Sequence, residues 1–106
     1  MASDLSFVEF ACEQIANAGA ISRRKMFGGY MIYVNLKPIV LVCNNTAYVK
    51  KLPEVARVAP DLEIGAPYKG AKDHYILNLD NADESREIAI ALEKITEIPK
   101  RKTKKN

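Results

Sequence analysis

Three adjacent cations and a glycine pair stand close together in this chain and are the residues whose types suit anion binding. They are Arg23-Arg24-Lys25 and Gly28-Gly29. A phosphate loop needs G-x-x-x-x-G-K-[ST] before a helix, and a dinucleotide loop needs G-x-G-x-x-G there. Neither spacing occurs, and an apolar segment typical of a strand follows. We interpret the glycines as a turn and leave two readings of the cations open, solvated edge charge or recognition of a phosphate or acidic partner.

Side chains for other chemistry are few and scattered. His74 is the single histidine, and Asp73 beside it would point to the opposite face of a strand, so no general base is indicated. Cys12 and Cys43 fall on apolar segments and are expected to be buried, unpaired thiols. Two cysteines and one histidine are also too few for a four-ligand zinc site without carboxylate ligands. We therefore predict no enzyme activity, no cofactor and no bound metal.

The positive charge of the chain is concentrated at its C-terminal end. The formal net charge is +3, yet residues 100–106 hold five cations and no acid, which leaves −2 for residues 1–99. We predict one folded domain over 1–99 and a disordered basic tail over 100–106. The cations between Lys100 and Lys105 suit weak, nonspecific and salt-sensitive binding to nucleic acid.

The N-terminal residues contain no basic segment followed by an apolar one, so no secretory signal is indicated. No apolar run approaches the roughly 20 residues of a membrane helix. We expect a cytoplasmic protein.

Hydrophobic periodicity and turn residues predict an α+β fold. Helices are expected at 4–18, at 53–59 and from a cap at Asn81 to about 97. Strands are expected at 24–27, 30–35, 38–43, 47–51 and 74–79, with Leu36-Lys37 and Asn44-Asn45 as hairpin connections. The order is α-β-β-β-β-α-β-α, a two-layer arrangement of three helices and a five-stranded antiparallel sheet.

The second and third predicted strands are apolar on both faces. Ile32 and Val34 alternate with Met31 and Tyr33, and residues 39–42 alternate in the same way. Helices on one face of an antiparallel sheet normally leave polar residues on the other. Either the helices cover parts of both faces, or the second face meets another copy or another protein.

Several segments together resemble the N-terminal domain of the TfoX/Sxy family, which is associated with regulators of DNA transformation competence in bacteria. The resemblance is carried by Arg24-Lys25-Met26-Phe27-Gly28-Gly29-Tyr30, then by Thr46-Ala47-Tyr48-Val49-Lys50, Pro67-Tyr68-Lys69-Gly70 and Tyr75. It extends over roughly residues 4–97. It implies a two-layer fold similar to secretion chaperones, which often pair as dimers, and it supplies no catalytic residue set.

These observations favour a non-enzymatic regulatory or protein-interaction domain, with a protein partner or a second copy of itself. The alternative is a nucleic-acid-associated protein that uses the basic tail and Arg23 to Lys25. A third class, a small enzyme or ligand binder, would need a deep pocket at His74 or Tyr68. The candidate interaction residues are Arg23, Arg24, Lys25, Phe27, Gly28, Gly29, Tyr30, Tyr68 and Lys69.

Overall fold

The computed structural model of the chain describes residues 4–26 and 28–99. Phe27 and the basic tail, with its cations from Lys100 to Lys105, lie outside these residues. The helices are α1 (Leu5–Gln14), the 3-10 helix η1 (Ala16–Ala18), α2 (Pro53–Val58) and α3 (Ala82–Ile95). The strands are β1 (Ile21–Met26), β2 (Gly29–Val34), β3 (Lys37–Cys43), β4 (Thr46–Lys50), β5 (Ile64–Gly65) and β6 (His74–Ile76).

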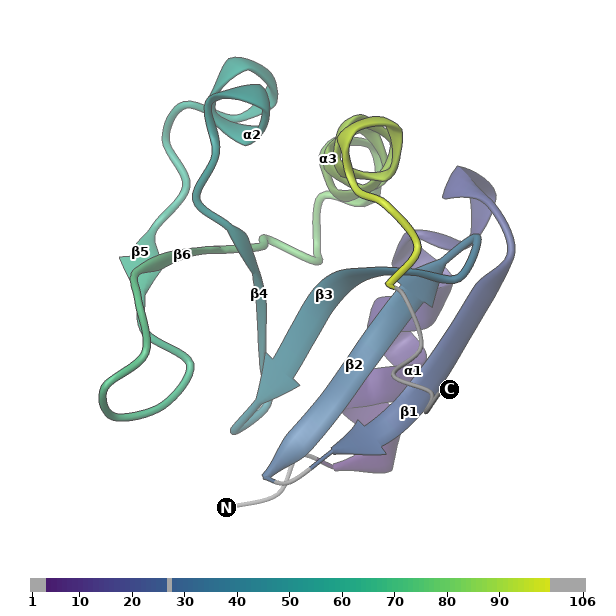
Figure 1. Cartoon of the computed structure of the whole chain (residues 1–106), viewed down its shortest axis with the longest axis vertical. Coiled ribbons are helices and arrows are strands. Elements are labelled where there is room, and N and C mark those ends of the chain that lie inside the picture. The colour runs from purple at the N-terminus through teal and green to yellow at the C-terminus, as the bar shows by residue number, and fades with distance from the viewer. Residues whose placement is uncertain (1–3, 27, 100–106) are drawn as a thin grey trace, which may run out of the picture.

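All six strands form one antiparallel sheet in the order β1-β2-β3-β4-β6-β5 (Figure 1). The predicted α+β class with an antiparallel meander is confirmed, but the predicted count of five strands is wrong. The additional strand, β5, has two residues and pairs with His74 and Tyr75. A segment of two residues is too short to show an alternation, so the pattern in the sequence could not reveal it.

Element ends differ from the predictions where local hydrogen bonds change. The first helix stops at Gln14 rather than at residue 18, because the chain tightens into η1 before Gly19. The predicted cap of the last helix is confirmed, since Asn81 Oδ1 accepts a 3.1 Å hydrogen bond from the Glu84 amide. The strand predicted for 74–79 ends at Ile76.

The hairpin turns use asparagine in the left-handed backbone region. Asn44 and Asn45 adopt φ of 52° and 55°, as expected for this pair. The preceding turn is formed by Asn35 and Leu36, one position earlier than predicted, with φ of 53° and 69°. Asn35 fixes this turn because its Oδ1 accepts a 2.9 Å bond from the Ala20 amide.

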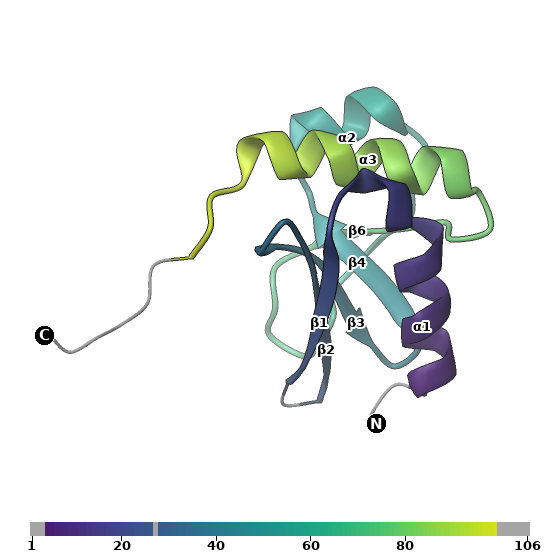
Figure 2. The ribbon, with the colours of Figure 1, turned by 90° about the vertical axis from the view of Figure 1, so that its right-hand side faces the viewer.

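The helices gather on one side and one end of the sheet. In Figure 2, α1 stands on one side of β1 and β2, α2 and α3 lie across the upper end, and the chain beyond α3 leaves on the side away from α1. One apolar core joins these layers and includes Val8 of α1, Ile15 between α1 and η1, Ile88 of α3, and Ile32 and Val40 of the sheet. The helices therefore bury one face of the sheet formed by β1, β2 and β3. The other face of these strands is not covered by α1.

Candidate functional site

The two faces of β2 have different exposure. Ile32 and Val34 are fully buried in the core, while Met31 and Tyr33 between them are only half-buried. The register places Met31 between Arg24 of β1 and Leu41 of β3, so these three side chains share the face away from the core. We call this the open face of the sheet.

A register shift modifies the alternation along β3. Between Ile32 and Tyr33, the β2 partner changes from Val40 to Pro38, so Ile39 is an extra residue in its strand. Ile39 is buried with Val40 in the core. The expectation that Ile39 and Val40 occupy opposite faces is therefore wrong. Strict alternation predicts Ile39 and Leu41 on the same face, but only Leu41 lies on the open face.

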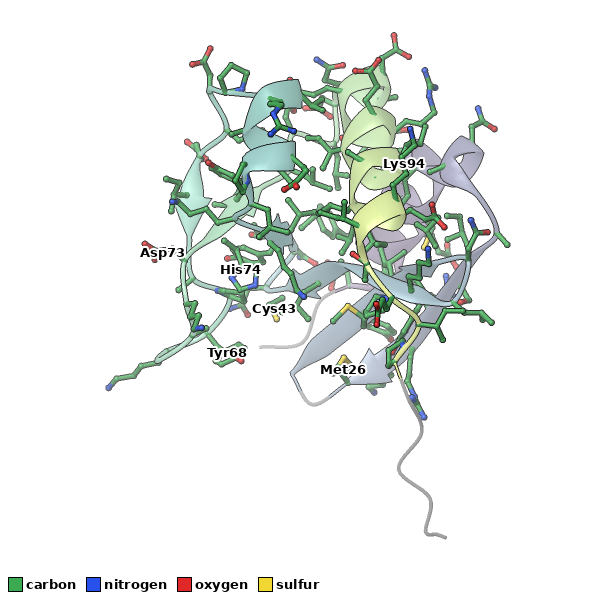
Figure 3. All side chains as sticks on the ribbon, turned by 45° about the horizontal axis from the view of Figure 1, so that its top comes forward. Met26, Cys43, Tyr68, Asp73, His74 and Lys94 are labelled. Atoms are coloured by element: carbon green, nitrogen blue, oxygen red, sulfur yellow. The ribbon has the colours of Figure 1, made fainter. Side chains whose placement is uncertain are left out.

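The open face contains a hollow of about 730 Å³. We call it the apolar groove. Met26 of β1 and Tyr68 of the β5–β6 loop are exposed at its two sides, while Cys43 is buried between them. Figure 3 shows these three residues on the side away from Lys94 of α3. The groove is lined by Met26, Gly28, Met31, Leu41, Cys43, Asn44, Pro67, Tyr68 and Lys69.

The floor of the groove depends on the glycine pair. Gly28 has φ of +83°, which favours glycine. Gly29 lies against β3 so closely that a Cβ would stand 2.1 Å from the Val42 carbonyl oxygen and 3.1 Å from Cys43 Sγ. Both glycines thus serve backbone geometry, as the turn interpretation predicts. Gly29 also leaves the space between Met26 and Cys43 free of a side chain.

Both cysteines are free thiols. Burial raises the pKa of the Cys43 thiol. Burial also raises the pKa of the Cys12 thiol, and the nearby Arg23 guanidinium partly offsets this increase. A raised pKa keeps Cys43 in the neutral thiol form at neutral pH, so it lines the groove as a small apolar group.

The cation triplet divides between the faces as the alternation predicts. Arg23 is on the helix side, where its guanidinium lies 3.8 Å from the Glu9 carboxylate. Arg24 pairs with Met31 on the open face. Neither Arg24 nor Lys25 has a carboxylate within 4.0 Å in the part of the chain that the structure describes.

The structure places the remaining candidate residues in different surroundings. Tyr68 and Lys69 line the groove together with Gly28. Tyr30 is half-buried and packs against the core on the helix side, so it does not reach the groove. The candidate residues predicted from the sequence do not include the aliphatic, thioether and thiol side chains of the groove, which are Met26, Met31, Leu41 and Cys43. The signal that points to them is the apolar character of both faces of 30–35 and 38–43.

A second hollow adjoins the groove on the open face. It measures about 610 Å³ and lies between β1, the β2–β3 turn and the chain after α3. Arg24, Leu36 and Ile98 line it, and both apolar side chains are more than half exposed. Pro99, the last residue that the structure describes, lines this hollow together with Arg24.

No constellation for catalysis converges at His74. Its Nδ1 lies 2.8 Å from the Lys72 carbonyl oxygen, and its ring meets Tyr48 edge-on at 6.3 Å. Asp73 points away from it (Figure 3). Over residues 4–26 and 28–99, no three His, Cys, Asp or Glu side chains are grouped to hold a metal ion. In the same ranges, no helix has the length and apolar character to cross a membrane.

Comparison with known proteins identifies the family. The model of the TfoX N-terminal domain matches residues 13–90. This chain belongs to the TfoX N-terminal domain family. The match begins in α1 and ends in α3, so this TfoX N-terminal domain includes β1 to β6 and the whole apolar groove.

A curated relative is an uncharacterized 12.7 kDa protein in the trpE 5′ region of Spirochaeta aurantia. The two are 33% identical over 76 residues, which are 72% of this chain and 66% of the relative. The matched region therefore spans just under two thirds of that protein.

Proposed function

We propose that this TfoX N-terminal domain is a non-enzymatic regulatory domain that acts by binding a protein through the apolar groove. The observation that carries the proposal is an apolar hollow on the sheet face opposite α1, with Met26 and Tyr68 exposed at its sides. Exposed apolar surface of this kind is typical of protein-binding sites. Methionine adapts well to a partner, because its side chain is flexible and polarizable.

The chemistry of the groove supports binding over catalysis. A catalytic pocket normally has a few convergent polar groups with altered pKa values. The polar members of this groove are Asn44 and Lys69 at its margin. The thiol in the floor is neutral because burial raises its pKa. The groove offers an apolar surface and lacks an activated nucleophile among its described residues.

The experiment compares partner capture by the wild-type chain and by two groove variants, Met31→Glu and Tyr68→Ser, from extracts of the source organism with and without nuclease treatment. The amount of a groove-binding protein captured by either variant should be at least about tenfold lower than the amount captured by the wild type. Met31→Glu places a charge in the groove, and Tyr68→Ser removes an aromatic contact. Sedimentation of the purified variants tests a second copy as the partner.

Ile64→Glu is the control, since Ile64 is an exposed aliphatic side chain on β5 that does not line the groove. It should capture the same proteins as the wild type. Equal capture by the groove variants would refute the proposal. Material lost on nuclease treatment, with binding that weakens steeply with salt and with deletion of 100–106, would instead support the nucleic-acid alternative.

A further inference from the structure

The outer edge of β1 is a second feature that the fold leaves available. β1 ends the sheet, and its ladder runs to β2 alone. An edge strand presents unpaired amide and carbonyl groups on its outer side, where another extended segment can add. Among the described residues, no strand or loop backbone pairs with that side.

The register shows which residues of β1 present these groups. The Asn35 amide donates a 2.8 Å bond to the Ala20 carbonyl, so Ala20 is hydrogen-bonded across the hairpin. Antiparallel pairs alternate between bonded and non-bonded positions. Residues 22, 24 and 26 therefore face β2, while Ile21, Arg23 and Lys25 direct their amides and carbonyls outward.

The charge on this edge is poorly compensated. Three consecutive positions are cationic, and only Arg23 has a carboxylate nearby, that of Glu9 at 3.8 Å. Glu9 and Glu13 both act on the helix side of the strand, around Cys12 and Arg23. An added segment therefore finds uncompensated positive charge at Arg24, on the open face, and at Lys25.

A second copy of β1 fits this edge badly. Antiparallel pairing must join outward-facing residues, which are the odd-numbered ones. The registers that use most of the strand place either Arg23 opposite Arg23 of the copy or Arg24 opposite Arg24. Like charges directly opposite one another destabilise a strand pair. The charge pattern thus disfavours self-pairing at this edge and favours an acidic strand.

We propose that β1 binds an acidic, extended segment of a protein partner as a seventh strand of the sheet. This inference rests on the proposed function, because it names the chemistry of the partner. The segment carries carboxylates opposite Arg24 and Lys25. Opposite Met26 it carries an apolar side chain, which enters the apolar groove because Met26 lines that groove. Backbone bonds to Arg23 and Lys25 supply affinity, and the cations select the sequence.

The probe is a short peptide, Thr-Val-Glu-Glu-Thr-Val, titrated into the isotope-labelled full chain by NMR. Antiparallel to β1, its first valine can lie opposite Met26 while its two adjacent glutamates lie opposite Lys25 and Arg24. Binding should slow hydrogen exchange of the Arg23 and Lys25 amides at least about tenfold, because strand addition protects outward amides. A peptide with glutamine in place of glutamate should bind about tenfold more weakly, since cross-strand ion pairs each contribute up to about 1 kcal/mol.

Two variants separate the backbone and charge contributions. Lys25→Pro removes one outward amide while the bonds to β2 remain, since proline is tolerated on an edge. Lys25→Gln removes only the charge. Peptide binding should be abolished by the first and weakened several-fold by the second.

Several results would overturn the inference: peptide binding without protection of the two amides, equal binding of the glutamine peptide, equal binding to Lys25→Pro, or displacement of the peptide by single-stranded DNA at lower concentration. In each case, loss of captured partner with Met31→Glu but not with Lys25→Pro would leave the proposed function standing. If neither the groove variants nor the Lys25 variants reduce partner binding, both the proposed function and this inference are refuted.

Discussion

The two faces of β2 and β3 have nearly the same apolar composition and opposite roles in the fold. Ile32, Val34 and Val42 are fully buried against the helices, whereas their neighbours Met31 and Leu41 line an open groove. Apolar residues on the first face contribute to folding by leaving water when the helices pack. Those on the second remain available, so the same composition that stabilises the domain on one side provides a binding surface on the other.

The largest expected effect comes from substituting adjacent residues on the two faces. Ile32→Ala should lower the free energy of unfolding by roughly 2–5 kcal/mol, because it leaves a cavity in a closed core. Met31→Ala should cost about 1 kcal/mol or less, because Met31 is already partly in water. Urea denaturation measures both values. Equal losses would show that the open face is packed as tightly as the covered one.

The next largest effect is a difference in stability between substitutions of the two glycines at the end of the groove, Gly28 and Gly29. Gly29→Ala should destabilise by roughly 1–3 kcal/mol, because the new Cβ collides with the Val42 carbonyl and β3 must shift. Gly28→Ala has open space around it and should cost roughly 1–2 kcal/mol for its positive φ alone.

Asparagine distinguishes the two causes in the same denaturation experiment. Gly28→Asn should recover part of the stability, because asparagine tolerates positive φ. Gly29→Asn should recover none, since its Cβ meets the same carbonyl. Recovery at both positions would contradict the steric explanation for Gly29.

The smallest effect concerns a polar contact between α3 and the turn that joins β2 to β3. Lys37 Nζ lies 3.0 Å from Glu93 Oε2, and Asn35 Nδ2 donates to the same oxygen at 3.3 Å. The hydrogen bond from Lys37, followed by that from Asn35, lowers the pKa of the Glu93 carboxyl. A lowered pKa in the folded state means that the contact stabilises the fold above the unfolded pKa, near 4.5, and that this stability is lost as pH falls through the folded value.

Urea denaturation from pH 7 to pH 3 measures this dependence. Glu93→Gln should be less stable than the wild type at pH 7, and the difference should shrink steadily below about pH 4.5. Glu87→Gln, at an exposed position of the same helix, should show no such convergence. A difference between Glu93→Gln and the wild type that stays constant over this range would show that ionisation of the Glu93 carboxyl does not stabilise the fold.

Local signals in the sequence predict much of the fold. The Asn44-Asn45 turn and the Asn81 cap depend on side chains that act on their own backbone, so a few neighbouring residues decide them. The turn at Asn35 and Leu36 is different. Leucine disfavours positive φ, yet it is held at 69° because Asn35 is bonded to both Ala20 and Glu93 from distant parts of the chain.

The candidate site could be predicted in part. The cation triplet, its division between faces and the presence of a second apolar face follow from the alternation of side chains along a strand. The groove does not, because it forms where the loop of Tyr68 and the end of β3 at Cys43 line the same hollow. Nothing in either segment specifies the other as its neighbour.

The sequence by itself determined the elements other than β5, the antiparallel meander and the apolar character of both sheet faces, since these depend on periodicity and on turn residues close in the chain. Only the tertiary structure decided which face the helices cover, that Ile39 enters the core through a bulge, and that Met26 and Tyr68 border one groove. The physical reason is that covering a face requires contacts between segments far apart in sequence, and their free energy depends on how all layers pack at once.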